Sequence, residues 1–365
     1  MSARVGKRVL FAVTVYNGLE SVPECLRSAS ATREGDHSVD FLVLDDCSPA
    51  PGVRDTLVSL CKELGFTYYR SPRNLGLPRN VNLALLRALD GRYDFAVIAN
   101  SDVRFAANLV DAFVATMAST ASIGSLTAWS NSASIFSLPN EHPDALGADQ
   151  AAIDLAGVAL RCEFRDVAVD IPVAVGFCMC IPTRVLQAVG VMDPVFGRGY
   201  CEENDWSLRS KSLGFRVALA PSAFAYHRGG GSMVAAGVLG AGASTVEANE
   251  RLLDLRFPWY RSQVEAYQRS DTQQDLRQRA LRSIIVEGAR VRGYEIWVGS
   301  PPVAHADRGQ VVVTIRDRRA AEGVTAAFRG FTSPLSIDGD PIDSIIRQIG
   351  SEPRAVRSGL EERPG

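Results

Sequence analysis

The stretch Phe95–Asp102, with the sequence FAVIANSD, indicates the fold class of this 365-residue chain. Its apolar run ends abruptly in the polar triplet Asn100-Ser101-Asp102. A short, almost wholly apolar run is typical of a central strand that is buried on both faces of a sheet. Polar side chains that follow such a strand lie at its carboxyl end, where open α/β sheets bind ligands. The stretch therefore predicts a buried strand that ends at a ligand site.

The composition is that of a soluble globular protein, with 46% hydrophobic and 22% charged residues. Lys and Arg number 39 against 41 Asp and Glu, so the formal net charge is -2, which argues against a nucleic-acid partner. No apolar run approaches the ~20 residues of a transmembrane helix, and we expect no transmembrane segment. The seven cysteines lack CxxC spacing, which favours free thiols in a reducing cytoplasm over a zinc cluster.

Strands alternate with helices upstream of Phe95. The predicted strands 9–15, 41–44 and 66–69 are each followed by apolar residues at helical spacing. This alternation indicates βαβ units and a mainly parallel sheet. Right-handed crossovers place the carboxyl ends of the strands on one edge, which predicts a pocket there. The polar residues at these ends are Tyr16, Asn17, Asp45, Asp46, Asn100 and Asp102.

An acidic cluster follows about 100 residues later. Glu202 and Glu203 are adjacent, with Asp205 beside them, and two such carboxylates are costly to bury without a task or a cation. Acidic residues at a helix start are also favoured simply by the helix dipole, so the cluster alone leaves both interpretations open. Further on, His227 precedes a glycine-rich stretch that runs to about Gly242 and is expected to be mobile.

The character of the chain changes in its last hundred residues. We predict a catalytic domain over 1–270, a C-terminal extension over 271–350 and a disordered charged tail over 351–365. Ala320–Phe328 is expected to be a helix. The extension matches no motif and is a candidate acceptor-binding lobe, homodimerisation element or partner-docking domain. The aromatic pair at 259–260 could contact a membrane surface, although ordinary packing is the default interpretation.

The order of these features resembles the inverting glycosyltransferases of family 2. The resemblance covers roughly Val9 to Tyr260. Its first half consists of VTVYNGLESVPECLRSA from residue 13, FLVLDDCSPA from 41, RSPRNLGLPRNVNLAL from 70 and VIANSDVRF from 97. Its second half consists of VGFCMCIPTRVLQAVGVMDPVFGRGYCEENDWSLRSKSLGF from 175 and PSAFAYHRGGGS from 221.

The resemblance implies an α/β, GT-A nucleotide-diphospho-sugar transferase fold with a mainly parallel mixed sheet and a small C-terminal α/β or helical extension. Residues 1–128 would form the nucleotide-binding half and residues 129–270 the acceptor and catalytic half. Thr14 and Tyr16 would line the base pocket, and Asp45 would accept a hydrogen bond from the ring imide of uracil or thymine. The other residues implied to bind the nucleotide sugar are Asn74, Gly76, Arg79, Asn100, Ser101 and Asp102.

The chemistry is implied by the second half of the resemblance. Glu203 matches the catalytic base, with Asp205 as its catalytic neighbour. Asp102 and His227 would hold Mg²⁺ or Mn²⁺. The acceptor site would include Glu202, Trp206 and Arg209.

One position departs from the family pattern. The commonest metal motif of the family is Asp-x-Asp, but the first position here is Asn100. An amide oxygen can ligate a hard cation or bond to ribose but brings no charge, which predicts weaker metal affinity. The Asn-x-Asp pattern is similar to that of rhamnosyltransferase-like members.

The implied reaction moves a hexosyl or deoxyhexosyl group from a UDP- or dTDP-sugar to a carbohydrate, lipid-linked or small-molecule acceptor, with inversion. The expected location is the cytoplasm, including the inner face of the membrane. A nucleotidyltransferase is a weaker alternative, because the loop TVYNGLES after the first strand contains no Lys or Arg. A non-catalytic sugar-nucleotide-binding scaffold is the other alternative. Asn100 favours it, whereas Glu203 and Asp205 oppose it.

Overall fold

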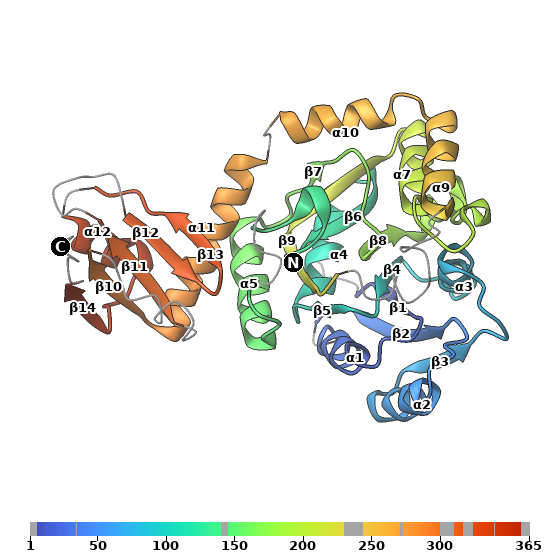
Figure 1. Cartoon of the computed structure of the whole chain (residues 1–365), viewed down its shortest axis with the longest axis horizontal. Coiled ribbons are helices and arrows are strands. Elements are labelled where there is room, and N and C mark those ends of the chain that lie inside the picture. The colour runs from blue at the N-terminus through green and yellow to red at the C-terminus, as the bar shows by residue number, and fades with distance from the viewer. Residues whose placement is uncertain are drawn as a thin grey trace.

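The computed structural model contains two β-sheets joined by a long helix (Figure 1). The larger sheet has the order β3-β2-β1-β4-β8-β6-β9-β5, with β7 paired to β9. The residues that the structure describes are 6–33, 35–139, 145–229, 244–270, 273–299, 310–316, 324–338 and 340–358. Most of the glycine-rich stretch after His227 therefore lies outside the described residues.

The first half of the large sheet is parallel, as its alternating pattern predicts. β4 lies between β1 and β8 and buries its apolar residues, so the FAVIAN run is a central strand. Thr14 pairs with Asn100 and Val15 with Asp45, which places these carboxyl ends side by side. The elements are β1 (Arg8–Val15), α1 (Val22–Ala31), β2 (Ser38–Asp45), α2 (Val53–Leu64), β3 (Thr67–Arg70), α3 (Leu77–Asp90) and β4 (Phe95–Asn100).

The second half makes the sheet mixed. β8 runs antiparallel to both β4 and β6, and β9 runs parallel to β6 but antiparallel to β5. Its strands are β5 (Val103–Phe105), β6 (Ile123–Trp129), β7 (Val169–Asp170), β8 (Cys178–Pro182) and β9 (Arg216–His227). Its helices are α4 (Leu109–Ser119), η1 (Ser134–Phe136), α5 (Gln150–Glu163), α6 (Thr183–Val189), η2 (Pro194–Phe196) and α7 (Glu202–Ser212).

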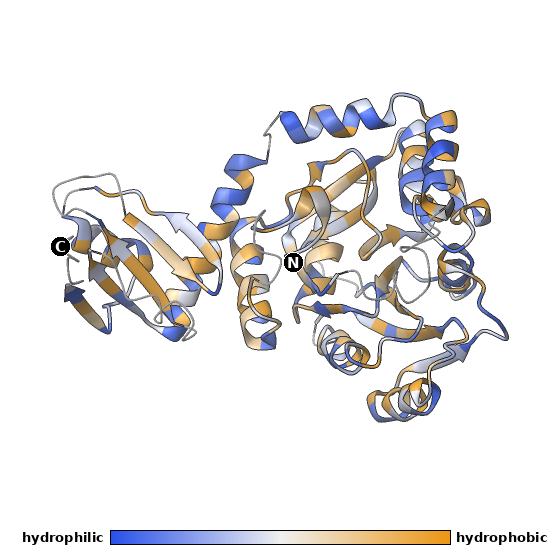
Figure 2. Ribbon diagram, in the orientation of Figure 1, coloured by the Kyte–Doolittle hydropathy of each residue, from blue (hydrophilic) through white to orange (hydrophobic). Residues whose placement is uncertain are grey.

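Three helices lead from this sheet to the smaller one. α9 (Ser244–Arg256) lies beside α7, and α10 (Tyr260–Arg269) has no buried residue and is mostly hydrophilic in Figure 2. α11 (Gln274–Arg292) packs on α5, where Ser283 donates a hydrogen bond to the carbonyl of Ala159, and also on the smaller sheet. The predicted boundary near residue 270 falls between α10 and α11 and stays a prediction.

The C-terminal extension is an α/β unit. Its sheet has the order β13-β12-β11-β10-β14, in which β10 pairs in parallel with β11 and β14. The elements are β10 (Tyr294–Val298), β11 (Val311–Ile315), β12 (Val324–Phe328), β13 (Phe331–Pro334), α12 (Pro341–Ile349) and β14 (Ala355–Ser358).

Two expectations for this region are wrong. Val324–Phe328, expected as the end of a helix, is a strand in which buried and partly buried side chains alternate. Ala355–Ser358, expected within a disordered tail, pairs with β10 along the edge of the sheet. Backbone hydrogen bonds hold this mostly exposed strand, and composition does not reveal them. Residues 359–365 lie outside the described residues.

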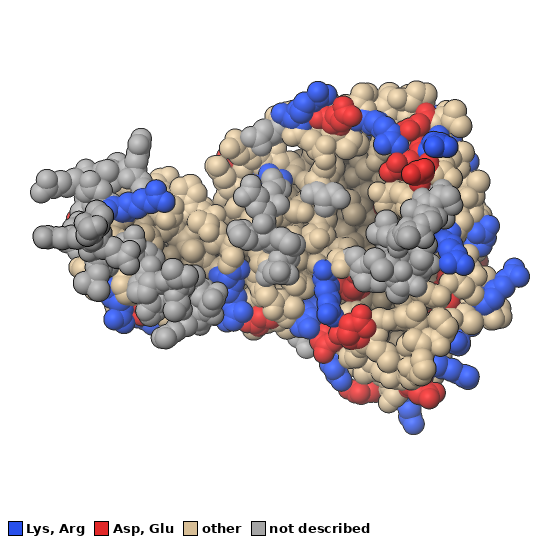
Figure 3. Space-filling view, viewed as in Figure 1, with Lys and Arg blue, Asp and Glu red and all other residues tan. Residues whose placement is uncertain are grey.

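The described surface mixes charges of both signs, and Figure 3 shows Lys and Arg interspersed with Asp and Glu on one face. Within the part of the chain that the structure describes, no helix is both long enough and apolar enough to cross a bilayer. All seven cysteines occupy described positions and are free thiols, as expected from their spacing.

Candidate active site

Asp45 lies at the end of β2 and is completely buried. One of its carboxylate oxygens accepts the backbone N–H of Ser48 at 2.8 Å. The other accepts the Tyr68 hydroxyl at 2.8 Å and pairs with the Arg70 guanidinium. Both oxygens therefore have protein partners, and the predicted contact with a nucleobase requires Arg70 or Tyr68 to move aside. Tyr16 directly follows β1 and is partly buried.

Asp46 holds the loop of residues 74–76, which includes two of the residues implied to bind the nucleotide sugar. Its carboxylate accepts the backbone N–H groups of Leu75 at 2.7 Å and Gly76 at 2.9 Å. The Asn74 side chain also accepts from the N–H of Gly76. Burial raises the pKa of Asp46, while these amides oppose the rise. The two consecutive aspartates at the end of β2, Asp45 and Asp46, are the sequence feature from which this role could have been predicted.

Gly76 allows this loop to approach the segment before α7. Its φ is +82°, and a Cβ atom there would lie 2.1 Å from the carbonyl oxygen of Gly197. Only glycine fits such a position. Arg79 and Asn74 are exposed on either side of the start of α3, where the helix dipole favours an anion.

Asp102 and His227 are brought together by strand register. Val103 pairs with His227 across β5 and β9, and Asp102 immediately precedes Val103. The Nε2 atom of His227 lies 3.3 Å from Oδ1 of Asp102. The other ring nitrogen, Nδ1, lies 2.8 Å from the carbonyl oxygen of Ser132, and the ring stacks on Phe177. Since a carbonyl only accepts, Nδ1 carries the proton when the ring is neutral, and the lone pair of Nε2 faces Asp102.

This pair fits a divalent cation. Asp102 is 7% exposed, and both of its carboxylate oxygens are buried without a hydrogen bond of good geometry. The 3.3 Å separation from Nε2 is close to the roughly 3 Å between neighbouring ligands of an octahedral cation with bonds of about 2.1 Å. Burial lowers the pKa of His227, but Asp102 and the Ser132 carbonyl raise it by more. Among the described residues, no cluster of three or more His, Cys, Asp and Glu could hold a metal alone. A cation here would need further ligands from a substrate.

Glu202 and Glu203 begin α7 and line a narrow pocket. Glu202 is 5% exposed, and its Oε2 atom has no hydrogen-bond partner among the residues that the structure describes. The free volume of the pocket is about 20 Å³, which is room for about one water molecule. Its other walls include Thr14 from β1, Asn100 from β4 and Gly176. The pocket thus joins the predicted nucleotide-binding half to the predicted catalytic half.

Both glutamates hold protons more tightly than usual. Burial, followed by the charge of Glu203, raises the pKa of Glu202 to about 8. Burial also raises the pKa of Glu203 from its ordinary value of 4.5, while backbone amides that include Gly176 and Asn204 oppose the rise. Glu202 is therefore expected to keep its proton at neutral pH, and the raised pKa of Glu203 makes its ionised form a stronger base than an exposed glutamate.

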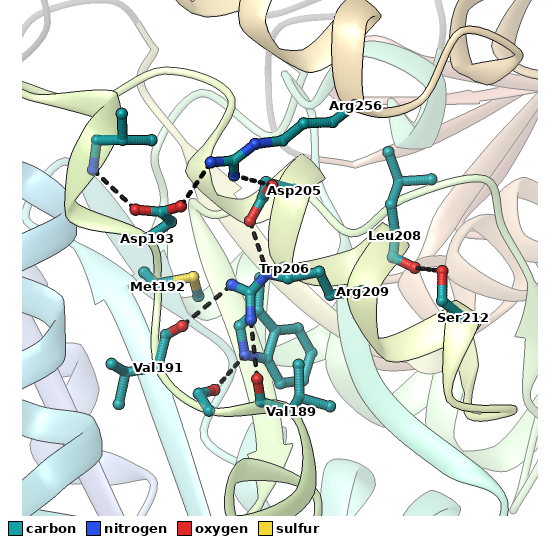
Figure 4. A network of polar contacts seen from close by, with 12 residues as sticks. Val189, Val191, Met192, Asp193, Asp205, Trp206, Leu208, Arg209, Ser212 and Arg256 are labelled. Carbon is teal, nitrogen blue, oxygen red and sulfur yellow. Dashed lines mark hydrogen bonds and ion pairs between the residues drawn. The ribbon is translucent and has the colours of Figure 1, made fainter.

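Asp205 differs from its expected catalytic role. It is completely buried, and its two oxygens pair with Nε of Arg209 and with Nη1 of Arg256, each at 2.7 Å (Figure 4). Arg209 also donates to the carbonyls of Val189 and Val191. Neither oxygen of Asp205 is left to bind a substrate, so we reassign it to holding α7, α9 and the turn after α6 together.

Trp206 and Arg209 also differ from their expected contact with an acceptor. Trp206 is completely buried, and its indole N–H donates to the carbonyl of Gly190 at 2.8 Å. Arg209 donates to Asp205 and to the carbonyls of Val189 and Val191, so it belongs to the network around Asp205. Trp206 and Arg209 lie about one and two turns of helix after Glu202, and their side chains donate to backbone carbonyls between Val189 and Val191 (Figure 4).

Replacement of Asp205 by Ala is expected to destabilise the protein by about 3 kcal/mol, because two arginines lose the carboxylate between them. The partial exposure of both arginines, at 29% and 32%, keeps the loss near the lower end for a buried ion pair. Urea unfolding measures it. Arg251→Ala, which removes a side chain that is 80% exposed, serves as the control and should shift the midpoint little. An unchanged midpoint for Asp205→Ala would show that the network contributes nothing.

Comparison with known proteins bears on the fold of the first part of the chain. Residues 11–151 match the family model described as glycosyl transferase family 2, and together with the sheet order this confirms the predicted α/β GT-A fold. A search of curated proteins finds no match.

Three similar solved structures have low sequence identity to this chain. A mannosyltransferase from Pyrobaculum calidifontis in complex with GDP-Man and Mn²⁺ is 16% identical, with 82% of this chain and 78% of that chain covered and a TM-score of 0.48. GalNAc-T7 with UDP, GalNAc and Mn²⁺ is 12% identical, with coverage of 76% and 55% and a TM-score of 0.49. S. aureus TarS 1–349 in complex with UDP-GlcNAc is 14% identical, with coverage of 77% and 81% and a TM-score of 0.48. None of these similarities is close enough to indicate a substrate.

Proposed function

Residues 11–151 form a glycosyl transferase family 2 domain, and from this premise we propose that the chain transfers a sugar from a UDP- or dTDP-sugar to an acceptor hydroxyl, with inversion at the anomeric carbon. The observation that carries the proposal is the pocket in which Glu202 and Glu203 face Thr14 and Asn100. In this pocket the Glu203 side chain, which would act as a base, lies next to the edge formed by the C-terminal ends of the strands, where the donor would bind.

Glu203 is the proposed general base. The acceptor hydroxyl oxygen attacks the anomeric carbon, its proton passes to the Glu203 carboxylate, and the bond from that carbon to the diphosphate oxygen breaks. Glu202, with its pKa of about 8, keeps its proton at neutral pH and can donate it in a hydrogen bond to the sugar or to Glu203.

The reaction also requires stabilisation of the negative charge that grows on the departing diphosphate. Arg79 is exposed in the first turn of α3 and is free to pair with phosphate oxygens, and the loop held by Asp46 offers the helix start for the same purpose. Asp102 and His227 would hold Mg²⁺ or Mn²⁺, which supplies positive charge to the diphosphate oxygens when bound. The base of the donor would be recognised at Asp45 once Arg70 moves away, which favours uracil or thymine.

A thermal-shift screen tests the donor site without knowledge of the acceptor. UDP or dTDP is expected to raise the melting temperature, and Mn²⁺ is expected to increase the shift, because ligands that bind only the folded state stabilise it. GDP and CDP serve as matched controls with the same diphosphate. Equal shifts with all four nucleotides would contradict base selection at Asp45, and the absence of any shift would contradict the donor site.

A further inference from the structure

The segment that leads into the acidic pair has an unusual backbone. Tyr200 and Cys201 immediately precede Glu202, and their φ angles are +80° and +77°. Two consecutive side-chain-bearing residues in the left-handed region are unfavourable by themselves and persist only where the surroundings hold them. The position of the two glutamates therefore depends on what restrains the residues from Phe196 to Cys201.

A single side chain from α9 provides that restraint. The amide nitrogen of Asn249 lies 3.0, 2.9 and 3.0 Å from the carbonyl oxygens of Phe196, Gly199 and Tyr200. Asn249 is 6% exposed, so water does not compete for these contacts. Because carbonyls only accept, the three of them also settle which end of the amide is the nitrogen.

The segment from Phe196 to Cys201 also contacts the loop that Asp46 holds, at residues 76–77. The N–H of Leu77 donates to the carbonyl of Arg198 at 3.2 Å, and Gly76 lies against the carbonyl of Gly197. Asn249 and the loop held by Asp46 therefore both contact the segment. A shift of the segment would move Glu203 relative to the donor.

We propose that Asn249 is a positioning residue, which fixes the Phe196–Cys201 segment and thereby aims Glu202 and Glu203 at the reaction centre. The catalytic part of this inference rests on the proposed function, whereas the restraint of the segment does not. α9 has other anchors, since Leu253 is 1% exposed and Arg256 pairs with Asp205 and Asp193. Asn249 is thus not needed merely to dock the helix.

The test compares Asn249→Asp with Arg256→Met by amide hydrogen exchange and by kinetics. Asn249→Asp keeps the size of the side chain but replaces the donor with an acceptor that faces three carbonyls. Arg256→Met removes the ion pairs of α9 two turns further on but keeps an apolar chain beside the Phe196 ring, over which the guanidinium lies. It leaves the Asn249 amide and its three carbonyl contacts in place. The amide of Gly199, which donates to the carbonyl of Phe196, reports opening of the segment. Asn249→Ala replaces Asn249→Asp if the buried carboxylate prevents folding.

We expect Asn249→Asp to speed exchange at Gly199 and to lower kcat for sugar transfer by about 10²-fold, because a small misplacement of a catalytic group has that effect. The Kd for UDP should stay within about twofold, since the loss is in the reacting geometry. Arg256→Met should lose stability with exchange at Gly199 unchanged. Unchanged exchange in Asn249→Asp, or an equal rise in Arg256→Met, would overturn the proposal. Faster exchange in Asn249→Asp, with wild-type protein that releases no nucleotide, would support the restraint and reject the proposed function.

Discussion

Glu203→Gln is expected to lower kcat for sugar transfer by about 10³-fold, within the range found for loss of a general base. The amide has the size of the carboxylate and can still accept hydrogen bonds, but it cannot take the proton of the acceptor hydroxyl. Because Glu203 belongs to the pocket at the sheet edge rather than to the Asp45 site, donor binding should change little. Nucleoside diphosphate release measures kcat, and the thermal shift with UDP or dTDP measures donor binding.

The pH profile provides an independent check on the same residue. Burial raises the pKa of Glu203 above 4.5, so the protonated, inactive form persists to higher pH than for an exposed glutamate. The acid limb of kcat/KM should therefore lie above pH 4.5 and the rate should increase with pH along it. Glu202→Gln replaces a carboxyl that is protonated in this pH range by a neutral amide, so the acid limb should stay in place while transfer continues. Normal turnover by Glu203→Gln, with a wild-type pH profile, would eliminate Glu203 as the base.

Asp102→Asn is expected to lower kcat/KM by about 10²-fold, because the charge that would hold the cation at the diphosphate is lost. EDTA should have a similar effect on the wild-type protein, and added Mn²⁺ should restore its activity. A direct readout is Mn²⁺ binding in the presence of UDP, which the substitution should weaken. His227 remains in place through its contact with Ser132, so the fold should survive.

A second aspartate–histidine pair in this chain offers a matched control for Asp102. His37 and Asp111 lie 3.8 Å apart, and burial raises the pKa of Asp111, but the carboxyl edge of the sheet does not include them. Asp111→Asn should leave Mn²⁺ binding and turnover unchanged. Turnover that resists EDTA, or equal losses in Asp102→Asn and Asp111→Asn, would refute the metal role of Asp102.

The sequence was informative where one strong pattern decides the structure. The FAVIAN run predicted a buried strand, and the polar residues after three strands were expected to meet at one edge, which placed Asp102 there. Glu203 was singled out by the family resemblance, and the catalytic role of Glu203 and the metal role of Asp102 stay predictions. The register that places His227 beside Asp102 follows from β5 and β9, and the resemblance predicted it indirectly.

The sequence was less informative for residues whose roles depend on long-range partners. Asp205 and Trp206 lie in the same polar run as Glu203, and only the distant contacts to Arg256 and Gly190 show that they are structural. Asn249 follows a segment without a motif, and its contacts to residues about 50 positions earlier could not be foreseen. The second sheet was missed in part because its edge strand β14 is mostly exposed.

Nucleoside diphosphate release shows whether the protein transfers a sugar with Glu203 as the base. Purified protein is incubated with UDP- and dTDP-sugars, Mn²⁺ and a panel of acceptor alcohols, beside the Glu203→Gln variant. We expect release of UDP or dTDP that depends on an acceptor, on Mn²⁺ and on Glu203. Binding of the nucleotide without release for any donor and acceptor, or equal release by Glu203→Gln, would contradict it.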